Sequence, residues 1–519
     1  MSGSLQPERV RIRGLDSCGR HQQPPLPLPP GPEGAPERQP ALRRPNGRPA
    51  SSGEPVRSRR EFLEKSAHGF GAIALSFLMQ SELGADPDPL APKPPHFAAK
   101  AKNVIFLFMQ GGPSHLDTFD PKPELARFDG QTVPPSFRAE GLNLQNLNAA
   151  ESKLMAPRRT FRRYGRSGIE ISDLFPNLAR HADELAVIRS CYHESFIHGP
   201  AFLVMNTGQL RMGYPSLGSW ILYGLGAESR ELPAYVVMAD TALRSSKTLF
   251  GPGFLPAVYQ GTMVRSEGAL FENLAAPAVL SAREQQVLLE KVGHWNRQHL
   301  QTREEDTRLA ARIRSYELAF RMQAAAPELM DLSRESEATR RLYGFDDKRT
   351  ERYGRMCLMA RRLVERGVRF VQLYNGEWDG HNECEQNHEK NAWSCDRPIA
   401  GLLEDLKSRG LLETTLVIWA GEFGRTPVMQ GSRGRDHSPY GFSIWMAGGG
   451  VRGGKVIGAT DEFGFRAVEN RVHPNDLHAT VLSLVGLDHL KLTYHFQGRD
   501  FRATDVGGLN NLAPALTRG

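Results

Sequence analysis

The sequence predicts an α/β protein, a three-layer sandwich with a mostly parallel sheet. Short, continuous apolar runs, typical of strands buried on both faces, recur between residues 102 and 446. Helical stretches separate most of these runs, so helix and strand alternate along the chain. Polar clusters with His, Asp or Glu directly follow several runs, as expected where loops leave the carboxyl ends of parallel strands.

The expected strands, in chain order, are the runs 103–109, 186–190, 233–238, 368–374, 414–420 and 443–446. The expected helices lie at about 175–185, 350–366, 398–407 and 475–485. A capping box at Ser281–Glu284 opens a longer, charge-rich helical stretch. Residues 282–345 are therefore predicted to be an insertion of two or three surface helices.

Composition indicates a globular protein with one large domain or two. Of the 519 residues, 40% are hydrophobic and 24% charged. The formal net charge is +7, but much of the surplus lies in the Arg-rich first sixty residues, so no nucleic-acid partner is expected. The five cysteines are too few and too scattered for a disulfide framework. Cys384 and Cys395 could bridge in an oxidising compartment, although free buried thiols are the expectation.

The N-terminal residues predict an address for export. Residues 1–56, dominated by Pro, Arg, Gly and Gln, are expected to be a disordered arm. Residues 57–85 resemble a twin-arginine signal peptide, with paired arginines at Arg59–Arg60, Phe62–Leu63 close behind and a weak apolar run to Met79. A basic linker before a helix is the competing interpretation.

A twin-arginine signal would set the limits of the mature chain and its location. Cleavage is expected near Ala85, and residues 86–101 would form a linker. Because such signals lie close to an initiator, the first fifty-odd residues could be a mis-called start, with Val56 as a plausible real initiator. The apolar run is too short for a stable membrane span. The mature protein is expected to be periplasmic or secreted, exported already folded by the twin-arginine machinery.

Two polar clusters follow the first two expected strands. The segment Gln110–Asp120 presents Ser114, His115 and Asp117 after strand 103–109, with glycines that allow a sharp turn. His193 and His198 are expected on the loop after strand 186–190.

Two further clusters follow later strands. Asp379 and His381 come after strand 368–374, and Glu422 ends strand 414–420. Asp436 and His437 are expected on the loop that follows. Carboxylates and imidazoles gathered at one rim suit a divalent metal or a proton-transfer site. The competing interpretation is an ordinary strand end with a surface salt bridge.

Five motifs carry a resemblance to a known family: Gly111–Asp120, Trp378–His381, Gly421–Pro427, Gly434–His437 and His473–Thr480. Over residues 102–507 the chain resembles the DUF1501 family, which itself looks like a distant branch of the alkaline phosphatase/sulfatase superfamily. Residues 508–519 would then be a tail. The resemblance implies that Asp379 and His381 take the place of the central metal ligands. It also implies that His437 is similar to the later metal histidine.

The chain departs from the superfamily pattern at two positions. Gln110 stands where the first metal acid would follow the first strand, and Asp117 could supply that carboxylate from further along. His198 opens the segment His198–Gly208 in the nucleophile's place. No Cys-x-Pro-x-Arg motif occurs, which excludes an ordinary sulfatase mechanism.

The resemblance implies an exported, metal-dependent hydrolase of phosphate or sulfate esters, acting on a small-molecule or polysaccharide anion. The implied metal ligands, for zinc or calcium, are Asp117, Asp379, His381, Glu422, Asp436 and His437. His198 would be nucleophile or general base, and Arg425 or Arg435 would clamp the anion of the substrate bidentately. Arg425 is counted as a catalytic residue, and Arg435 and His115 as substrate-binding residues. Two alternatives stay open: a non-catalytic extracytoplasmic binding protein, and a structural partner that docks through helices 282–345.

Overall fold

The computed structural model describes residues 88–134, 151–244, 247–265, 281–301 and 307–518. Internal contacts divide the chain into two units, 1–84 and 85–519, and every described residue belongs to the second. The predicted arm (1–56) and signal peptide (57–85) therefore lie outside the described residues.

An eight-stranded sheet forms the centre of this unit, in the order β12-β4-β11-β8-β1-β7-β5-β6. Neighbouring strands are parallel except at β11, which is antiparallel to both β8 and β4. The predicted mostly parallel sheet is confirmed. The strands are β1 (Asn103–Met109), β4 (Ala186–Cys191), β5 (Tyr235–Ala239), β6 (Thr262–Met263), β7 (Phe370–Asn375), β8 (Thr415–Gly421), β11 (Phe442–Ala447) and β12 (Lys455–Ile457).

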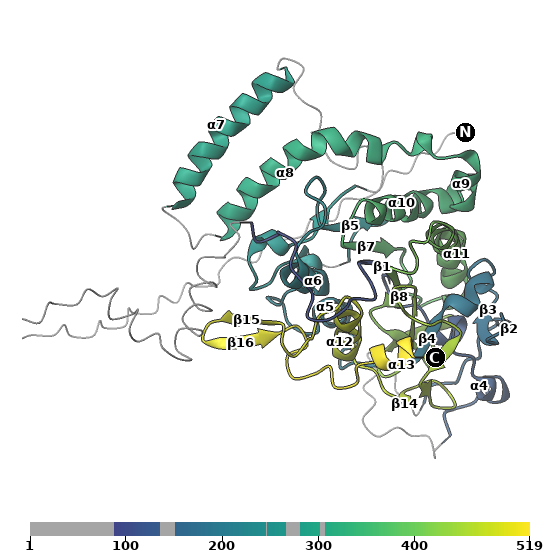
Figure 1. Cartoon of the computed structure of the whole chain (residues 1–519). Coiled ribbons are helices and arrows are strands. Elements are labelled where there is room, and N and C mark those ends of the chain that lie inside the picture. Colours follow the sequence, from purple (N-terminus) through teal and green to yellow (C-terminus); the bar gives the residue numbers. More distant parts are fainter. Residues whose placement is uncertain (1–87, 135–150, 245–246, 266–280, 302–306, 519) are drawn as a thin grey trace, which may run out of the picture. The chain divides into compact units, whose positions relative to one another are not determined.

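Helices cover both faces of the sheet, as the strand β1 illustrates (Figure 1). Phe106 and Phe108 pack in one hydrophobic core, with α5 (His198–Thr207), α6 (Leu217–Leu225) and α12 (Pro474–Leu484). Leu107 and Met109 point the other way, into a core with α10 (Lys348–Glu365) and α11 (Cys384–Ser408). Burial on both faces explains the unbroken apolar runs of the strands.

Several elements differ from their predicted limits. The helix expected at 398–407 begins earlier, at Cys384. The buried face of its first turns includes His388 and Asn391, so the sequence there shows no apolar stripe that would have predicted the helix. The segment expected as a helix at 175–185 is a 3-10 helix, η2 (Leu178–Glu184). Residues 282–345 contain α7 (Ala282–Gln301), α8 (Thr307–Met330), η5 (Leu332–Arg334) and α9 (Glu337–Leu342). The capping box forms as expected, since Ser281 and Glu284 hydrogen-bond reciprocally.

The segment after β8 was expected to be a loop, and this expectation is wrong. It folds into an antiparallel hairpin of β9 (Gly424–Gln430) and β10 (Gly434–Ser438). Asp436 and His437 therefore lie on a strand. The hairpin is mostly buried but rich in charged residues, so it has neither the alternation nor the apolar run that predicts a strand. His198, also expected on a loop, is the first residue of α5.

The segments that flank the predicted domain pack onto it. Lys100 and Ala101 of the expected linker donate backbone hydrogen bonds to the carbonyl oxygen of Leu484 (2.8 and 2.9 Å). In the expected tail, α13 (Ala513–Thr517) buries Leu516 in the core shared with α12.

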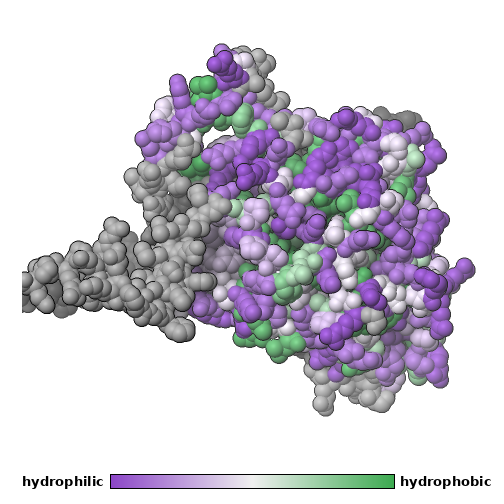
Figure 2. All heavy atoms as spheres, in the orientation of Figure 1, coloured by the Kyte–Doolittle hydropathy of each residue, from purple (hydrophilic) through white to green (hydrophobic). Residues whose placement is uncertain are grey.

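The remaining elements are α3 (His115–Thr118), α4 (Pro123–Arg127), β2 (Phe161–Tyr164), β3 (Ile169–Ser172), η3 (Lys247–Phe250), η4 (Ala257–Tyr259), β13 (Ala459–Thr460), β14 (Ala467–Glu469), β15 (Thr493–Phe496) and β16 (Arg499–Arg502). The face of the molecule seen in Figure 2 is mainly hydrophilic, with small, separate hydrophobic patches. Within the described ranges, no helix has the length and apolar character that crossing a membrane requires.

Candidate metal site at the rim of the sheet

Asp379 forms the centre of a polar cluster at the carboxyl end of the sheet. It lies on the loop that follows β7, and this loop rests directly on the end of β1. Trp378 donates its backbone N–H to the carbonyl oxygen of Gln110 (2.7 Å). A side chain at Gly111, where φ is +105°, would come within 2.5 Å of the backbone nitrogen of Asp379. Glycine at this position therefore permits the close approach of the loop to the strand.

Three histidines surround the Asp379 carboxylate with their Nε2 atoms. His381 and His437 lie 3.1 and 3.2 Å from Oδ1, and His198 lies 3.2 Å from Oδ2. The Nε2 atoms of His381 and His437 are only 2.8 Å apart. Three segments distant in sequence thus bring four potential metal-binding side chains together.

Each of the three imidazoles also has an acceptor at its Nδ1 atom. The acceptors are Oε1 of Glu422 for His198 (2.6 Å), Oε1 of Gln430 for His381 (2.6 Å) and the carbonyl oxygen of Phe196 for His437 (2.8 Å). An Nδ1 proton donated to such an acceptor leaves Nε2 as the free lone pair in the neutral ring. Histidines that bind metals are oriented in this way.

Electrostatics in the cluster differ from one ring to the next. Burial lowers the pKa of His437 to about 4, so this ring is neutral at pH 7. The hydrogen bond with Asp379 raises the pKa of His381. Burial lowers the pKa of His198, but hydrogen bonds to Asp379 and Glu422 outweigh it and the net shift is upward. Burial opposes ionisation of Asp379, yet the three histidines and Arg425 hold its pKa well below the usual range.

Two buried side chains, Glu422 and Arg425, hydrogen-bond to members of the cluster. Glu422 is fully buried and accepts the backbone N–H of Gly111 (2.8 Å) as well as Nδ1–H of His198. Arg425, also fully buried, donates to Asp379 Oδ1 (2.7 Å) and to three backbone carbonyl oxygens. Glu422 therefore contacts the ring of His198 from the side opposite Asp379.

Asp117 and Arg435 pair with each other. Arg435 Nε donates to Asp117 Oδ2 (2.9 Å), and both side chains are buried. The hydroxyl of Ser114 donates to the same carboxylate oxygen (2.5 Å). His115 does not join this pair: its Nε2 atom hydrogen-bonds with the carbonyl oxygen of Gly464 (2.9 Å). None of these contacts reaches the Asp379 cluster.

Asp436 lies at the edge of the cluster, with Oδ1 3.9 Å from Nδ1 of His381. Two sets of side chains have ligand atoms within 4.8 Å of one another: His198, Asp379 and His437, and also His381, Asp436 and His437. Of the predicted ligands in the described part of the chain, Glu422 and Asp117 belong to neither set.

Comparison with known proteins identifies the family. A model described as "Protein of unknown function (DUF1501)" matches residues 101–513. The chain belongs to the DUF1501 family. The predicted membership is confirmed, and the match extends beyond the predicted domain of 102–507 into the C-terminal segment. Among curated proteins, no sequence matches this DUF1501 chain.

Solved structures similar to this DUF1501 protein include members of the alkaline phosphatase and sulfatase group. One is described as a protein in the alkaline phosphatase superfamily from Vibrio parahaemolyticus (11% identity, 78% of this chain and 71% of that chain, TM-score 0.32). Another is PsFucS1 sulfatase from Pseudoalteromonas sp. (14%, 84% and 75%, 0.33). A third is phosphonate monoester hydrolase SpPMH from Silicibacter pomeroyi (12%, 80% and 76%, 0.30).

Arg244, which follows β5 at the same rim, was not among the predicted site residues. Its Nη1 donates to Asp379 Oδ2 (2.7 Å) and lies 3.4 Å from Nε2 of His198. The segment after β5 contains no His, so no metal-ligand pattern marked it in the sequence. Its acid, Asp240, accepts hydrogen bonds from Asn375 and Gly376. The position of the segment after a parallel strand was the available signal.

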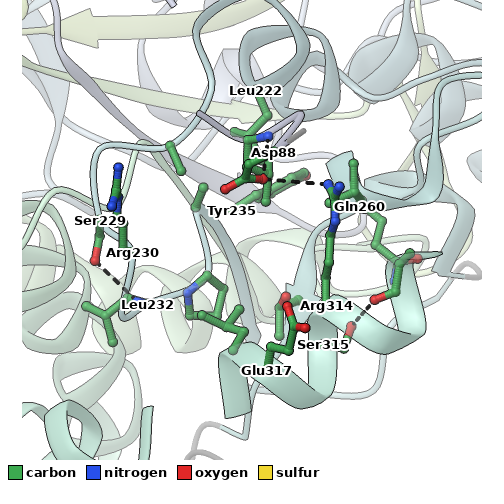
Figure 3. A pocket seen from close by; sticks show the side chains of 18 of the residues that line it. Asp88, Leu222, Ser229, Arg230, Leu232, Tyr235, Gln260, Arg314, Ser315 and Glu317 are labelled. Carbon is green, nitrogen blue, oxygen red and sulfur yellow. Dashed lines mark hydrogen bonds and ion pairs between the residues drawn. The ribbon is translucent and has the colours of Figure 1, made fainter. Parts of the chain in front are cut away.

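The cavity drawn in Figure 3 is separate from the cluster in this DUF1501 protein. It has a volume of about 640 Å³ and lies between α8 and the start of the described chain. Asp88 and Arg314 face each other in it, 3.6 Å apart, near Tyr235 and Glu317. No residue of the Asp379 cluster lines it.

Proposed function

We propose that Asp379, His381 and His437 bind one divalent metal ion, and that the protein is a metal-dependent hydrolase of phosphate or sulfate esters. The observation that supports this proposal is that the Nε2 atoms of His381 and His437 both contact the Asp379 carboxylate. Each ring is also held by a hydrogen bond at its Nδ1 atom. Two nitrogen atoms 2.8 Å apart beside a carboxylate need a proton or a cation between them. A cation there would satisfy all three groups.

The donor set favours zinc over calcium. Zinc accepts imidazole nitrogen and carboxylate oxygen, usually four ligands in all, and a catalytic zinc has three protein ligands. Calcium instead takes six to eight oxygen atoms, which this cluster does not offer. His381 and Asp379 are partly exposed, at 29% and 16% of their side-chain areas, so an ion and a substrate can reach them.

His198 is proposed as the general base or nucleophile. Glu422 accepts its Nδ1 proton at 2.6 Å and so fixes the ring with Nε2 directed toward the centre of the cluster. A carboxylate that orients a catalytic histidine in this way also stabilises the ring when it takes up a proton. The bound ion would act as a Lewis acid toward the ester oxygen.

We expect the variant His198→Ala to lose turnover and retain zinc. Turnover of p-nitrophenyl phosphate or sulfate should fall by about 100-fold or more, the usual contribution of a positioned base. Zinc affinity, measured by competition with a chromogenic chelator, should change little. His495→Ala is the control, since His495 pairs with Asp500 on the exposed hairpin β15–β16. If turnover is untouched, the proposed role of His198 is wrong.

A binding protein without turnover is the second candidate. One observation favours it: the side chain of Gln110, in the place of a metal acid, bonds to the residues after β5. Zinc binding with no hydrolysis of any phosphate or sulfate ester by the unmodified protein would support this candidate.

We also propose that the protein acts outside the cytoplasm, because Ser58–Lys65 carries the pattern of a twin-arginine signal. Residues 57–85 fused to a fluorescent protein should direct the folded reporter to the periplasm of a bacterium that has this pathway. The double variant Arg59→Lys, Arg60→Lys should keep it in the cytoplasm. Equal export of both fusions would contradict the proposal.

A further inference from the structure

We propose that Arg244, positioned by Gln110, is the residue that binds the anionic group of the substrate. This inference rests on the proposed metal-dependent function and assigns a role that sequence analysis gave to Arg425 and Arg435. It also narrows the proposed substrates to monoesters.

The two arginines assigned from sequence are fully buried, and every nitrogen of each guanidinium already donates a hydrogen bond within the protein. The guanidinium of Arg425 is fully buried and bonds to Asp379 and to the carbonyl oxygens of Gly111, Gly112 and Arg435. That of Arg435 is equally buried. Its three nitrogens donate to Asp117 and to the carbonyl oxygens of Thr426 and Met155. Both groups hold the fold of the rim together.

Arg244 differs in exposure and in its contacts. Its side chain is 28% exposed, and Nη1 lies between Asp379 Oδ2 and His198 Nε2. Within the described ranges, neither Nε nor Nη2 of Arg244 donates a hydrogen bond. The planar guanidinium therefore has donors available for a ligand that approaches the cluster from solvent.

Gln110 fixes the position of Arg244 from inside the sheet. Its side chain is fully buried at the end of β1. Nε2 donates to Oγ1 of Thr241 (3.1 Å), and Oε1 accepts the backbone N–H of Arg244 (3.1 Å). One amide thus holds both ends of the segment 241–244. A carboxylate here could not donate to Thr241, which gives a physical reason for glutamine.

The geometry points to a tetrahedral oxyanion with three unesterified oxygens. A guanidinium fork binds two oxygens of one anion side by side. A third oxygen would face the metal-binding atoms next to Arg244. Phosphate and sulfate monoesters have three such oxygens, whereas a phosphate diester has two.

The test uses the zinc-loaded full chain and inorganic phosphate as the probe, followed by calorimetric titration. Arg244→Gln should weaken phosphate binding by about 10- to 100-fold, the usual range for a lost charge-assisted hydrogen bond. Its zinc affinity should stay that of the unmodified protein. Arg244→Lys should recover part of the loss, because it restores the charge without the fork. Arg163→Gln is the control, since Arg163 is 80% exposed and its closest acid lies 3.9 Å away.

The role of Gln110 is tested by a double-mutant cycle. Gln110→Leu should weaken phosphate binding in the same direction, and adding it to Arg244→Gln should cost nothing further. Additive losses would overturn the positioning role. Methyl phosphate should compete with inorganic phosphate and dimethyl phosphate should not, and equal competition would overturn the monoester assignment.

The outcomes separate this inference from the function on which it rests. Zinc binding together with an Arg244→Gln variant that retains full phosphate affinity overturns the inference alone. Zinc binding without any phosphate binding by the unmodified protein does the same. Failure of the unmodified protein to bind zinc overturns both.

Discussion

Replacing His381 with alanine is expected to weaken zinc binding by more than about 100-fold, beyond the 10- to 100-fold typical of losing a group that only orients a ligand. The variant removes one of the two Nε2 atoms that approach each other to 2.8 Å beside Asp379. Turnover should fall in parallel, because the remaining side chains offer too few donors to hold the ion. The fold should survive, since His381 lies on a partly exposed loop.

Zinc affinity of this variant is measured by chelator competition, with His495→Ala as the matched control. Circular dichroism of both variants checks that the fold is retained. An unchanged zinc affinity in His381→Ala would remove His381 from the site and leave the proposed ligand set incomplete.

The variant Asp117→Asn is expected to destabilise the protein by about 3–5 kcal/mol, the cost of leaving one partner of a buried ion pair uncompensated. The substitution keeps the volume and removes the charge that faces Arg435 Nε at 2.9 Å, where neither side chain reaches solvent. The experiment is done without metal. A metal-ligand role for Asp117 would instead leave the metal-free stability unchanged.

Urea denaturation of the metal-free chain measures this effect. Glu351→Gln is the control: it breaks an exposed i,i+4 pair with Arg355, for which about 0.3–0.5 kcal/mol is expected. Adding Arg435→Met to Asp117→Asn should recover part of the loss by removing the unpaired charge. A loss below 1 kcal/mol in Asp117→Asn would show that the pair is not structurally important.

The sequence predicted the strands because their physical signal is local. After their first residues, Asn103 and Thr415, β1 and β8 are apolar and buried on both faces, so each run alone identified a central strand. The hairpin of β9 and β10 gave no such signal. Its strands include Arg425, Arg435 and His437, whose burial is possible only because distant carboxylates and carbonyl oxygens compensate them.

In the candidate site, too, local patterns in the sequence predicted some residues and could not predict others. Asp379, His381 and His437 were selected because polar residues at the carboxyl ends of parallel strands converge, and in the structure they do meet. Spacing along the chain could not separate them from Asp117, whose partner Arg435 is 318 residues away. Gln110 and Arg244 also depend on a contact between distant segments, so no local pattern marked their pairing.

The most direct test of the central claim is the zinc content of the purified full chain, measured by elemental analysis after dialysis against zinc. Clustering of the Nε2 atoms of His381 and His437 on Asp379 predicts about one ion per chain. It also predicts a melting temperature that falls in chelator, since a bound ion stabilises the folded state by mass action. A chain that retains no zinc, and melts at the same temperature with and without chelator, would contradict the claim.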